Sequence, residues 1–332
     1  METKTEKRKM VIVYGNCHTL VISKMLESSP SFNESYYIYN IKRIQDIKDT
    51  SYLYSDFFNQ CDVFIHQSIR LNNRYGEEFA SEKIIERLKP SCQVISIPNV
   101  YHLPTCFFPQ YSEEKELRTE QLGTYFFRDR ILDKYIYHPF SLITSAKKDY
   151  QSEDLFDNNA IREEFDKFIA KVRKREEDWD IKVADYIMAN YQDYKMFYDP
   201  NHPTNRFLEY ISNKLLNILL ERPADAVEKL SSDICLDAIE MPVCKATIKA
   251  LNLKWHDTLL RTSYPHTNLA PICMNFTYYA ITYYALYWII DPKIGGGMSK
   301  MIFYLLKPVV FVRRVIRKLR RMFLSRINIH DS

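Results

Sequence analysis

Cys17 directly follows an apolar segment, in the run Gly15-Asn16-Cys17-His18, and a helical pattern begins after it. Backbone N–H groups and the positive end of a helix dipole favour an anion at such a position. The same field lowers the pKa of a thiol and supplies donors for an oxyanion. We therefore interpret Cys17 as a candidate nucleophile, with a buried, inert cysteine as the alternative.

A nucleophilic thiol needs a base, and His202 is the histidine best placed to provide one. It lies in Asp199-Pro200-Asn201-His202-Pro203, before an apolar helical pattern. Pro203 suits the first helical position, and a helix amino terminus disfavours imidazolium. We therefore expect a neutral His202 that can accept a proton, with Asp199 orienting its ring. The alternative is that Asp199, Asn201 or His202 only caps the helix.

Polar side chains at other segment ends provide candidate oxyanion and substrate contacts. His18 adjoins Cys17 but should point in another direction, so we expect it to touch substrate or to stay exposed. Gln67 and Asn99 each end or follow an apolar segment, and their amides could donate to an oxyanion. The full set of these candidates is Gly15, Asn16, His18, Gln67, Asn99 and Asn201.

Two arginines, Arg70 and Arg74, follow the segment 62–67 and could meet phosphate groups. Solvated loop arginines are the alternative for both. A metal site is not expected, because the seven cysteines include no CxxC and no other paired ligand spacing.

The composition excludes some nucleotide folds and indicates a compartment. With six glycines there is no GxGxxG and no GxxxxGK[ST], which argues against a dinucleotide fold or a nucleotide-triphosphate loop. The cysteine number is odd, and the charged start METKTEKRKM leads directly into a strand pattern. We therefore expect reduced thiols and a cytoplasmic location.

Short apolar segments alternate with helical patterns over the first hundred residues, which predicts an α/β fold with a parallel, flavodoxin-like sheet. The predicted strands are 10–14, 35–41, 62–67 and 93–98, and the predicted helices are 18–28, part of 43–60, and 77–89. In such sheets ligands bind beyond the carboxyl ends of the strands. The candidate residues after three of these strands should therefore meet at one edge of the sheet.

From about residue 113 the pattern becomes largely helical. The helical stretches are 113–132, 153–180, 181–197 and a helix within 199–221. We therefore predict three parts. The sheet occupies 1–112, a helical part that completes the site occupies 113–299, and a tail occupies 300–332.

The net charge of +4 is due to the tail. Residues 300–326 hold nine basic residues and no acidic one, so the remainder of the chain carries −5. Apolar residues mixed with arginines over 301–327 predict an in-plane helix on an anionic membrane surface. A solvated basic helix, or one packed on an acidic partner, is the alternative. Nucleic acid is not expected as a partner, because the rest of the chain is acidic.

The uncharged segment 269–290 is long enough to span a bilayer. Tyrosines and Pro271 interrupt its apolar character. We therefore expect a buried or interfacial helix there.

Four motifs together resemble the WcbI family, coenzyme A-binding acetyltransferases of polysaccharide biosynthesis. The motifs are Gly15-Asn16-Cys17, Pro98-Asn99, Arg175-Glu176-Glu177 leading into Ile181-Lys182-Val183-Ala184-Asp185, and Asn201-His202-Pro203-Thr204. The resemblance covers about residues 10–290. His18 departs from the family pattern, which has glutamine after the cysteine in many members, and the tail is not accounted for.

By extension the layout is similar to the SGNH hydrolase and acetyltransferase superfamily. There a Gly-Asp-Ser turn follows the first strand and an Asp-x-x-His pair lies near the end of the catalytic domain. Cys17 would take the place of the serine, and Asp199 and His202 would match the pair. This match lies well before the end of the present chain, which makes the Asp199 role less secure.

The resemblance implies an O-acyltransferase, in particular an acetyltransferase. It would move an acyl group from a coenzyme A thioester such as acetyl-CoA to a sugar hydroxyl of a capsule, lipopolysaccharide or exopolysaccharide precursor. His202 would deprotonate either Cys17 or the acceptor hydroxyl. Two alternatives stay open: an SGNH-like esterase or deacetylase, and a non-catalytic, membrane-associated glycan-binding or scaffold protein.

Overall fold

The computed structural model describes residues 8–39, 42–100, 103–119, 124–135, 139–236 and 241–255. The chain divides into two compact units. The first comprises Met1–Pro109 and Phe156–His256, and the second comprises Gln110–Leu155 and Asp257–Ser332. The segments 269–290 and 301–327, for which the sequence predicts an interfacial helix and a membrane-surface helix, lie outside the described residues.

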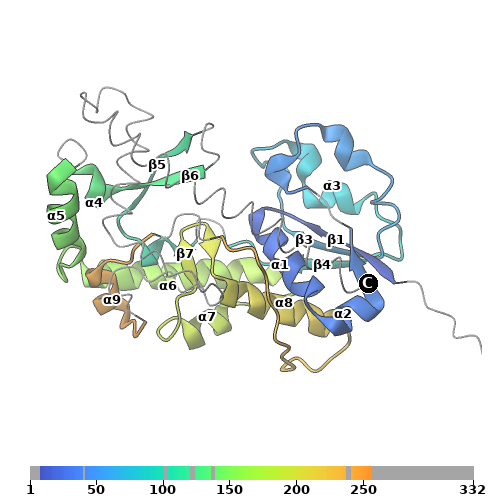
Figure 1. Ribbon diagram of the computed structural model, residues 1–332. Coiled ribbons are helices and arrows are strands. Elements are labelled where there is room, and N and C mark those ends of the chain that lie inside the picture. The colour runs from blue at the N-terminus through green and yellow to red at the C-terminus, as the bar shows by residue number, and fades with distance from the viewer. Residues whose placement is uncertain are drawn as a thin grey trace, which may run out of the picture. The chain divides into compact units, whose positions relative to one another are not determined.

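A four-stranded parallel sheet forms the centre of the first unit (Figure 1). Across the sheet, the strands are β2 (Tyr36–Ile38), β1 (Lys9–Tyr14), β3 (Val63–Gln67) and β4 (Gln93–Ile97). Every residue of β3, and all of β1 after Lys9, is buried. Strands buried on both faces are typical of parallel sheets covered by helices. The predicted α/β fold with a parallel sheet is therefore confirmed.

Successive side chains along each strand point to opposite faces of this sheet. Ile12, Tyr14 and Phe64 join a hydrophobic cluster with Phe79 and Ile84. This cluster lies under α3 (Ser81–Ile85), whereas α1 (Cys17–Glu27) covers the other face (Figure 1). The predicted helix over 77–89 is shorter than expected, because a 3₁₀ turn at Glu77–Phe79 precedes α3.

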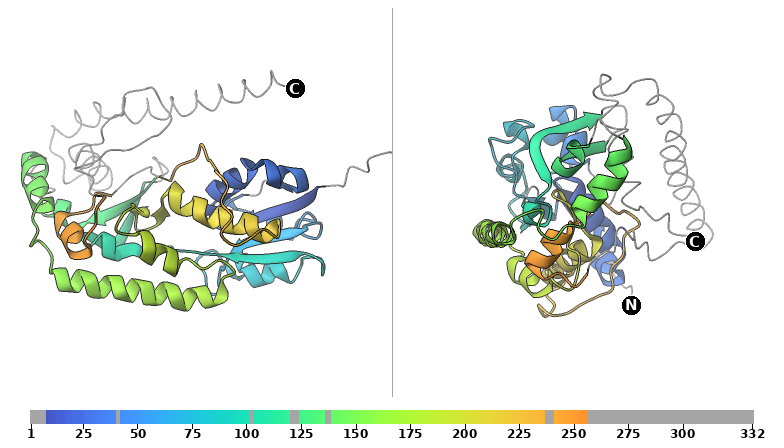
Figure 2. Two further views of the ribbon diagram at one scale, coloured as in Figure 1. Left: turned by 90° about the horizontal axis from the view of Figure 1, so that it is seen from below. Right: turned by 90° about the vertical axis from the view of Figure 1, so that its left-hand side faces the viewer.

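Further helices, all but one of which follow residue 156 in the chain, complete the first unit (Figure 2). The elements are α2 (Pro30–Ser35), α6 (Asn158–Arg175), α7 (Ala184–Asn190), the short strands β7 (Phe197–Asp199) and β8 (His202–Pro203), α8 (Asn205–Leu219) and α9 (Lys245–Leu251). The long helix α8 packs on α1. Its buried stripe includes Phe207, Ile211 and Leu215, as its helical spacing predicts. Phe107, Phe165, Phe168 and Phe197 form an aromatic cluster beside it.

The second unit begins with an antiparallel hairpin where the sequence pattern predicts a helix. Strands β5 (Tyr111–Thr119) and β6 (Thr124–Asp129) pair across 113–129, and helices α4 (Arg130–Asp133) and α5 (Pro139–Tyr150) follow. The prediction of a helix over 113–132 is therefore wrong. Glutamates and lysines favoured a helix, but Thr124-Tyr125-Phe126-Phe127 is a run of strand formers, and cross-strand pairing overrides weak helix propensity.

Within the residues that the structure describes, no helix is both long enough and apolar enough to cross a membrane.

Candidate active site

Cys17 is the first residue of α1, three residues beyond the end of β1. Asn16 caps this helix, since its side-chain Oδ1 accepts a hydrogen bond from the backbone N–H of His18 at 3.0 Å. Cys17 is half-buried. The structure therefore places this thiol at a capped helix amino terminus, as the sequence predicts.

Gly15 is required because another side chain lies against it. Its φ is +156°, and a Cβ on it would lie 2.5 Å from Gln67 Oε1 and 2.8 Å from Thr19 Cγ2. The same Gln67 Oε1 accepts a hydrogen bond from the Asn16 N–H at 2.9 Å. A glycine at this position therefore lets the Gln67 amide reach the backbone that carries Cys17.

We expect Gly15→Ala to lower the free energy of unfolding by about 1–3 kcal/mol, the usual effect of overpacking, and to reduce activity. The added methyl group would push away Gln67 and break the bond to Asn16. Urea unfolding and enzyme assays check this. Gly76→Ala is the control: it strains a backbone with φ +122° that makes no contact with the site. An activity loss no larger than that of Gly76→Ala would contradict the prediction.

Gln67 is fully buried and ties three strand ends together. Besides accepting from Asn16, its Nε2 donates to the Pro98 carbonyl and to His18 Nδ1, each at 3.2 Å. An amide has two N–H bonds, so both are used in the fold. This arrangement supports a positioning role for Gln67 and leaves it no free hydrogen for an oxyanion.

His18 is 1% exposed, so the expectation that it stays exposed is wrong; contact with substrate stays a prediction. Its Nε2 lies 2.8 Å from the Asn201 carbonyl oxygen. A carbonyl can only accept, so Nε2 carries the proton and Nδ1 accepts from Gln67. Burial lowers the pKa of His18 to about 3. The neighbouring His202 ring lowers it further, whereas the hydrogen bond to the Asn201 carbonyl acts to raise it. His18 is therefore a neutral link between α1 and the His202 loop.

A consequence is that the protein loses stability in acid through His18. The unfolded histidine takes up a proton below its ordinary pKa of about 6.5, but the folded one does so only near 3. The free energy of unfolding should therefore fall as the pH decreases from 6.5 toward 3, by up to about 1.4 kcal/mol per pH unit from this group. Urea unfolding of wild type and His18→Gln at several pH values measures this share. Equal pH slopes for the two proteins would contradict it.

Asp199, the last residue of β7, and His202, the first residue of β8, form a tight pair across the turn between these strands. Asp199 Oδ2 accepts from His202 Nδ1 at 2.7 Å. Its Oδ1 accepts the backbone N–H groups of Asn201 at 2.7 Å and His202 at 2.9 Å. The carboxylate is 1% exposed, so the fold fixes it and the ring orientation together. With Nδ1 engaged, the ring presents Nε2 as its other nitrogen, and the Cys17 side chain lies near enough to the ring to raise its pKa.

The environment of His202 differs from the expected one. Burial alone would lower the pKa of its ring, but the Asp199 carboxylate and the Cys17 side chain raise that pKa well above 6.5. Nor does the ring stand at a helix end, because α8 begins at Asn205 and its cap is Thr204. The expectations of a neutral His202 and of Pro203 at the first helical position are therefore wrong. The possibility that Asp199, Asn201 or His202 caps the helix is excluded for the same reason.

The predicted phosphate-binding arginines differ in their surroundings. Arg74 is exposed and its guanidinium donates to the Tyr75 hydroxyl at 2.8 Å. Arg70 is also exposed. Burial is the main reason that the pKa of Arg175 is lowered, and the positive charge of Arg70 lowers it further. Arg175 ends α6, and its Nη1 donates to the Asn99 carbonyl at 3.3 Å. Two guanidinium groups thus lie near each other, close to the half-buried Asn99 at the end of β4.

Arg175 was not among the candidates from sequence, although it belongs to the Arg175-Glu176-Glu177 motif. The neighbouring Glu176 explains part of this motif, since its buried carboxylate accepts the N–H groups of Val183 at 2.8 Å and Ala184 at 3.0 Å. Glu176 therefore caps the segment that starts α7, and the preceding arginine is left at the carboxyl edge of the sheet.

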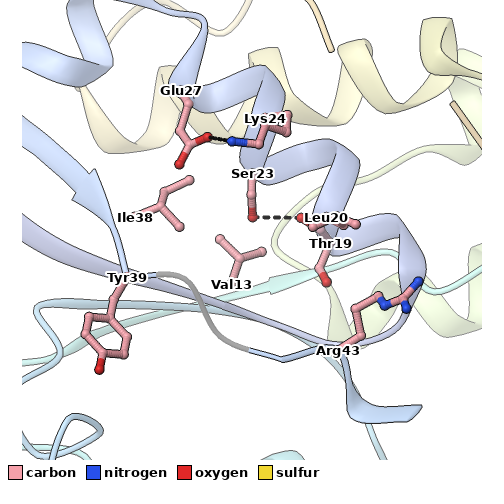
Figure 3. A pocket seen from close by; sticks show the side chains of 9 residues that line it. All are labelled: Val13, Thr19, Leu20, Ser23, Lys24, Glu27, Ile38, Tyr39 and Arg43. Atoms are coloured by element: carbon pink, nitrogen blue, oxygen red, sulfur yellow. Dashed lines mark hydrogen bonds and ion pairs between the residues drawn. The ribbon is translucent and has the colours of Figure 1, made fainter. Parts of the chain in front are cut away.

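Two further features of the described residues bear on ligands. Nowhere in 8–255, outside the gaps given above, do three His, Cys, Asp or Glu side chains gather as metal ligands would, and the expectation of a site without metal stays a prediction. A shallow pocket lies between α1 and the end of β2 (Figure 3). An ion pair of Lys24 with Glu27 at 2.5 Å borders it, and none of its lining residues is a predicted site residue.

Comparison with known families tests the resemblance that the motifs suggest. Residues 10–220 match the family described as polysaccharide biosynthesis enzyme WcbI. This chain belongs to the WcbI family. It is therefore one of a family of polysaccharide biosynthesis enzymes, and the resemblance drawn from the motifs is confirmed. Every candidate residue from Gly15 to His202 lies inside the matched region.

A solved structure of WcbI, described as a novel polysaccharide biosynthesis enzyme, shares this fold. The two chains are 18% identical with a TM-score of 0.62, and the match covers 76% of this chain and 81% of that one. That structure is described as the native protein without a disulfide bond between coenzyme A and a cysteine. No curated protein matches the chain.

Proposed function

We propose that this WcbI-family protein is an O-acyltransferase that moves an acyl group, in particular acetyl, from a coenzyme A thioester to a sugar hydroxyl. One observation carries the proposal: Cys17 at a helix amino terminus contacts His202, whose other ring nitrogen is held by buried Asp199. Nucleophile, base and orienting carboxylate in this order are the constellation of acyl-transfer enzymes.

In the proposed mechanism the proton shared by Cys17 and His202 lies on the His202 ring when Cys17 Sγ attacks the thioester carbonyl. Asp199 stabilises this imidazolium. Collapse of the tetrahedral intermediate breaks the carbon–sulfur bond to coenzyme A, and His202 protonates the leaving thiolate. His202 then accepts the proton of the sugar hydroxyl, which attacks the acyl-cysteine, forms the ester and restores the thiol. The raised pKa of His202 suits the step in which it acts as an acid.

Backbone geometry supports the N–H of Cys17 as an oxyanion donor. The Asn16 N–H is bonded to Gln67 and the His18 N–H to Asn16. Within the described part of the chain, the Cys17 N–H donates to no acceptor. It therefore remains directed to a ligand at the positive end of α1.

Arg70 and Arg175 are the residues that we assign to the phosphate groups of coenzyme A. Burial and, after it, the charge of Arg70 lower the pKa of Arg175, and a bound phosphate would offset both effects. We place the protein in the cytoplasm, with the tail 301–327 on the anionic inner face of the membrane, near its sugar or polysaccharide precursor.

Calorimetry with coenzyme A tests this assignment. Arg175→Ala should weaken binding about 10–100-fold, the effect of losing a charge-assisted hydrogen bond. Arg74→Ala is the matched control and should bind as wild type does, because its guanidinium is engaged with Tyr75. Absence of coenzyme A binding by the wild-type protein, together with hydrolysis of simple esters, would instead indicate an esterase.

A further inference from the structure

Two cysteines lie together at the edge of the sheet opposite to the candidate active site. Cys61 precedes β3 and Cys92 precedes β4. These strands are parallel neighbours in the register Val63 to Gln93, and the Gln93 N–H donates to the Asp62 carbonyl at 2.9 Å. The two cysteines are therefore brought together by the strand pairing itself.

Their side chains share one face of the sheet. Cys61 belongs to the hydrophobic cluster under α3, and Cys92 packs against the same cluster. The two thiols are neighbours, and each shifts the pKa of the other. Cys61 is fully buried, with its Sγ 3.0 Å from the Val63 carbonyl, whereas Cys92 is half-buried and accessible to small reagents.

The surroundings give the two sulfurs different chemistry. The Cys61 side chain and the nearby Lys89 ammonium lower the pKa of Cys92, although burial and Asp62 act against this. The Cys92 side chain and burial raise the pKa of Cys61. Lys89 is itself held by Asp62 at 2.5 Å. An accessible sulfur with a lowered pKa beside a buried protonated one is an arrangement of attacking and resolving thiols.

We propose that Cys61 and Cys92 are a redox pair that closes to a reversible disulfide when the protein meets a peroxide. The Cys92 thiolate attacks one peroxide oxygen, the O–O bond breaks, and sulfenic acid and hydroxide form. The Cys61 sulfur then attacks the Cys92 sulfur, the S–O bond breaks, and a second hydroxide takes up the thiol proton as water. Two thiols and one hydrogen peroxide thus give one disulfide and two waters, and an added dithiol reverses the reaction.

Peptide mapping of the full-length protein tests the pair. After treatment with hydrogen peroxide and blocking of free thiols, a non-reducing digest should contain a peptide linking Cys61 to Cys92, which dithiothreitol releases. In Cys61→Ser the reaction should stop at sulfenic acid on Cys92, trapped by dimedone. In Cys92→Ser, Cys61 should remain a free thiol.

Two results would overturn the proposal. One is that Cys61 and Cys92 both remain alkylatable after peroxide has oxidised other cysteines such as Cys17. The other is that the linked peptide forms no faster in the folded protein than in protein unfolded by urea, since the fold would then not bring the sulfurs together. Neither result depends on acyl transfer, so the pair and the proposed function can fail separately.

Discussion

Replacing Cys17 by alanine should lower the rate of acyl transfer by about three orders of magnitude or more, as should replacing His202 by alanine. In the proposed mechanism, the first change removes the atom that would form the acyl-enzyme, and the second removes the group that would move each proton. Because the two residues act as a unit, the double variant should be little worse than either single one. Transfer from acetyl-CoA to sugar acceptors measures these rates.

Mass spectrometry of the protein after brief exposure to acetyl-CoA measures the proposed covalent step directly. Wild type should carry an acetyl group on Cys17, and Cys17→Ala should carry none. Cys92→Ser in reducing buffer is the matched cysteine control, since Cys92 lies at the opposite end of the sheet, and it should transfer at the wild-type rate. If Cys17→Ala transfers at a rate near wild type while His202→Ala does not, the sugar attacks the thioester directly and Cys17 only lines the pocket.

Asp199→Asn should lower the transfer rate by about two to four orders of magnitude while preserving the fold. An amide keeps the size of the carboxylate and can still accept from backbone N–H groups. It cannot stabilise an imidazolium, and it can turn its own N–H toward His202 Nδ1 and impose the wrong tautomer. The pKa of His202, which the Asp199 carboxylate raises, should fall in this variant.

The same substitution should alter stability in a defined pH range. His202 has a raised pKa in the folded protein, so its ion pair with Asp199 stabilises fully below the unfolded pKa of about 6.5. This stabilisation is lost as the pH rises through the folded pKa. Nuclear magnetic resonance titration of the His202 ring, with urea unfolding across that range, measures both effects. An unchanged His202 pKa in Asp199→Asn would show that the carboxylate does not control the ring.

The sequence predicts those parts of the molecule that depend on local pattern. Buried runs such as Val11–Val13 and Val63–Ile65 identify the parallel strands, because only strands covered on both faces are apolar at successive positions. The rule that ligands bind beyond the carboxyl ends of strands then brings Cys17, Gln67 and Asn99 to one edge. The pairing of Asp199 with His202 follows from their separation by three residues.

What the sequence does not predict depends on contacts between distant residues. His18 appears from its position to be a surface neighbour of Cys17, but Gln67 and Asn201 bury it and fix its tautomer. The neutral state expected for His202 assumed a helix end, whereas the Asp199 carboxylate determines its charge. Arg175 is distant in sequence from Asn99, so its position at the sheet edge follows only from the course of α6.

The loop from Asp199 to His202 is a self-contained unit. Carboxylate, imidazole and the two backbone N–H groups that hold the carboxylate lie within four consecutive residues, so closing this loop costs little chain entropy. The pair of base and acid can therefore form before the rest of the site does. The long-range step is docking this loop onto α1, where the bond from His18 to the Asn201 carbonyl joins the two. The spacing of thiol and base is thus set by how this unit packs on α1, whereas the pairing of the base with its carboxylate is fixed within the unit.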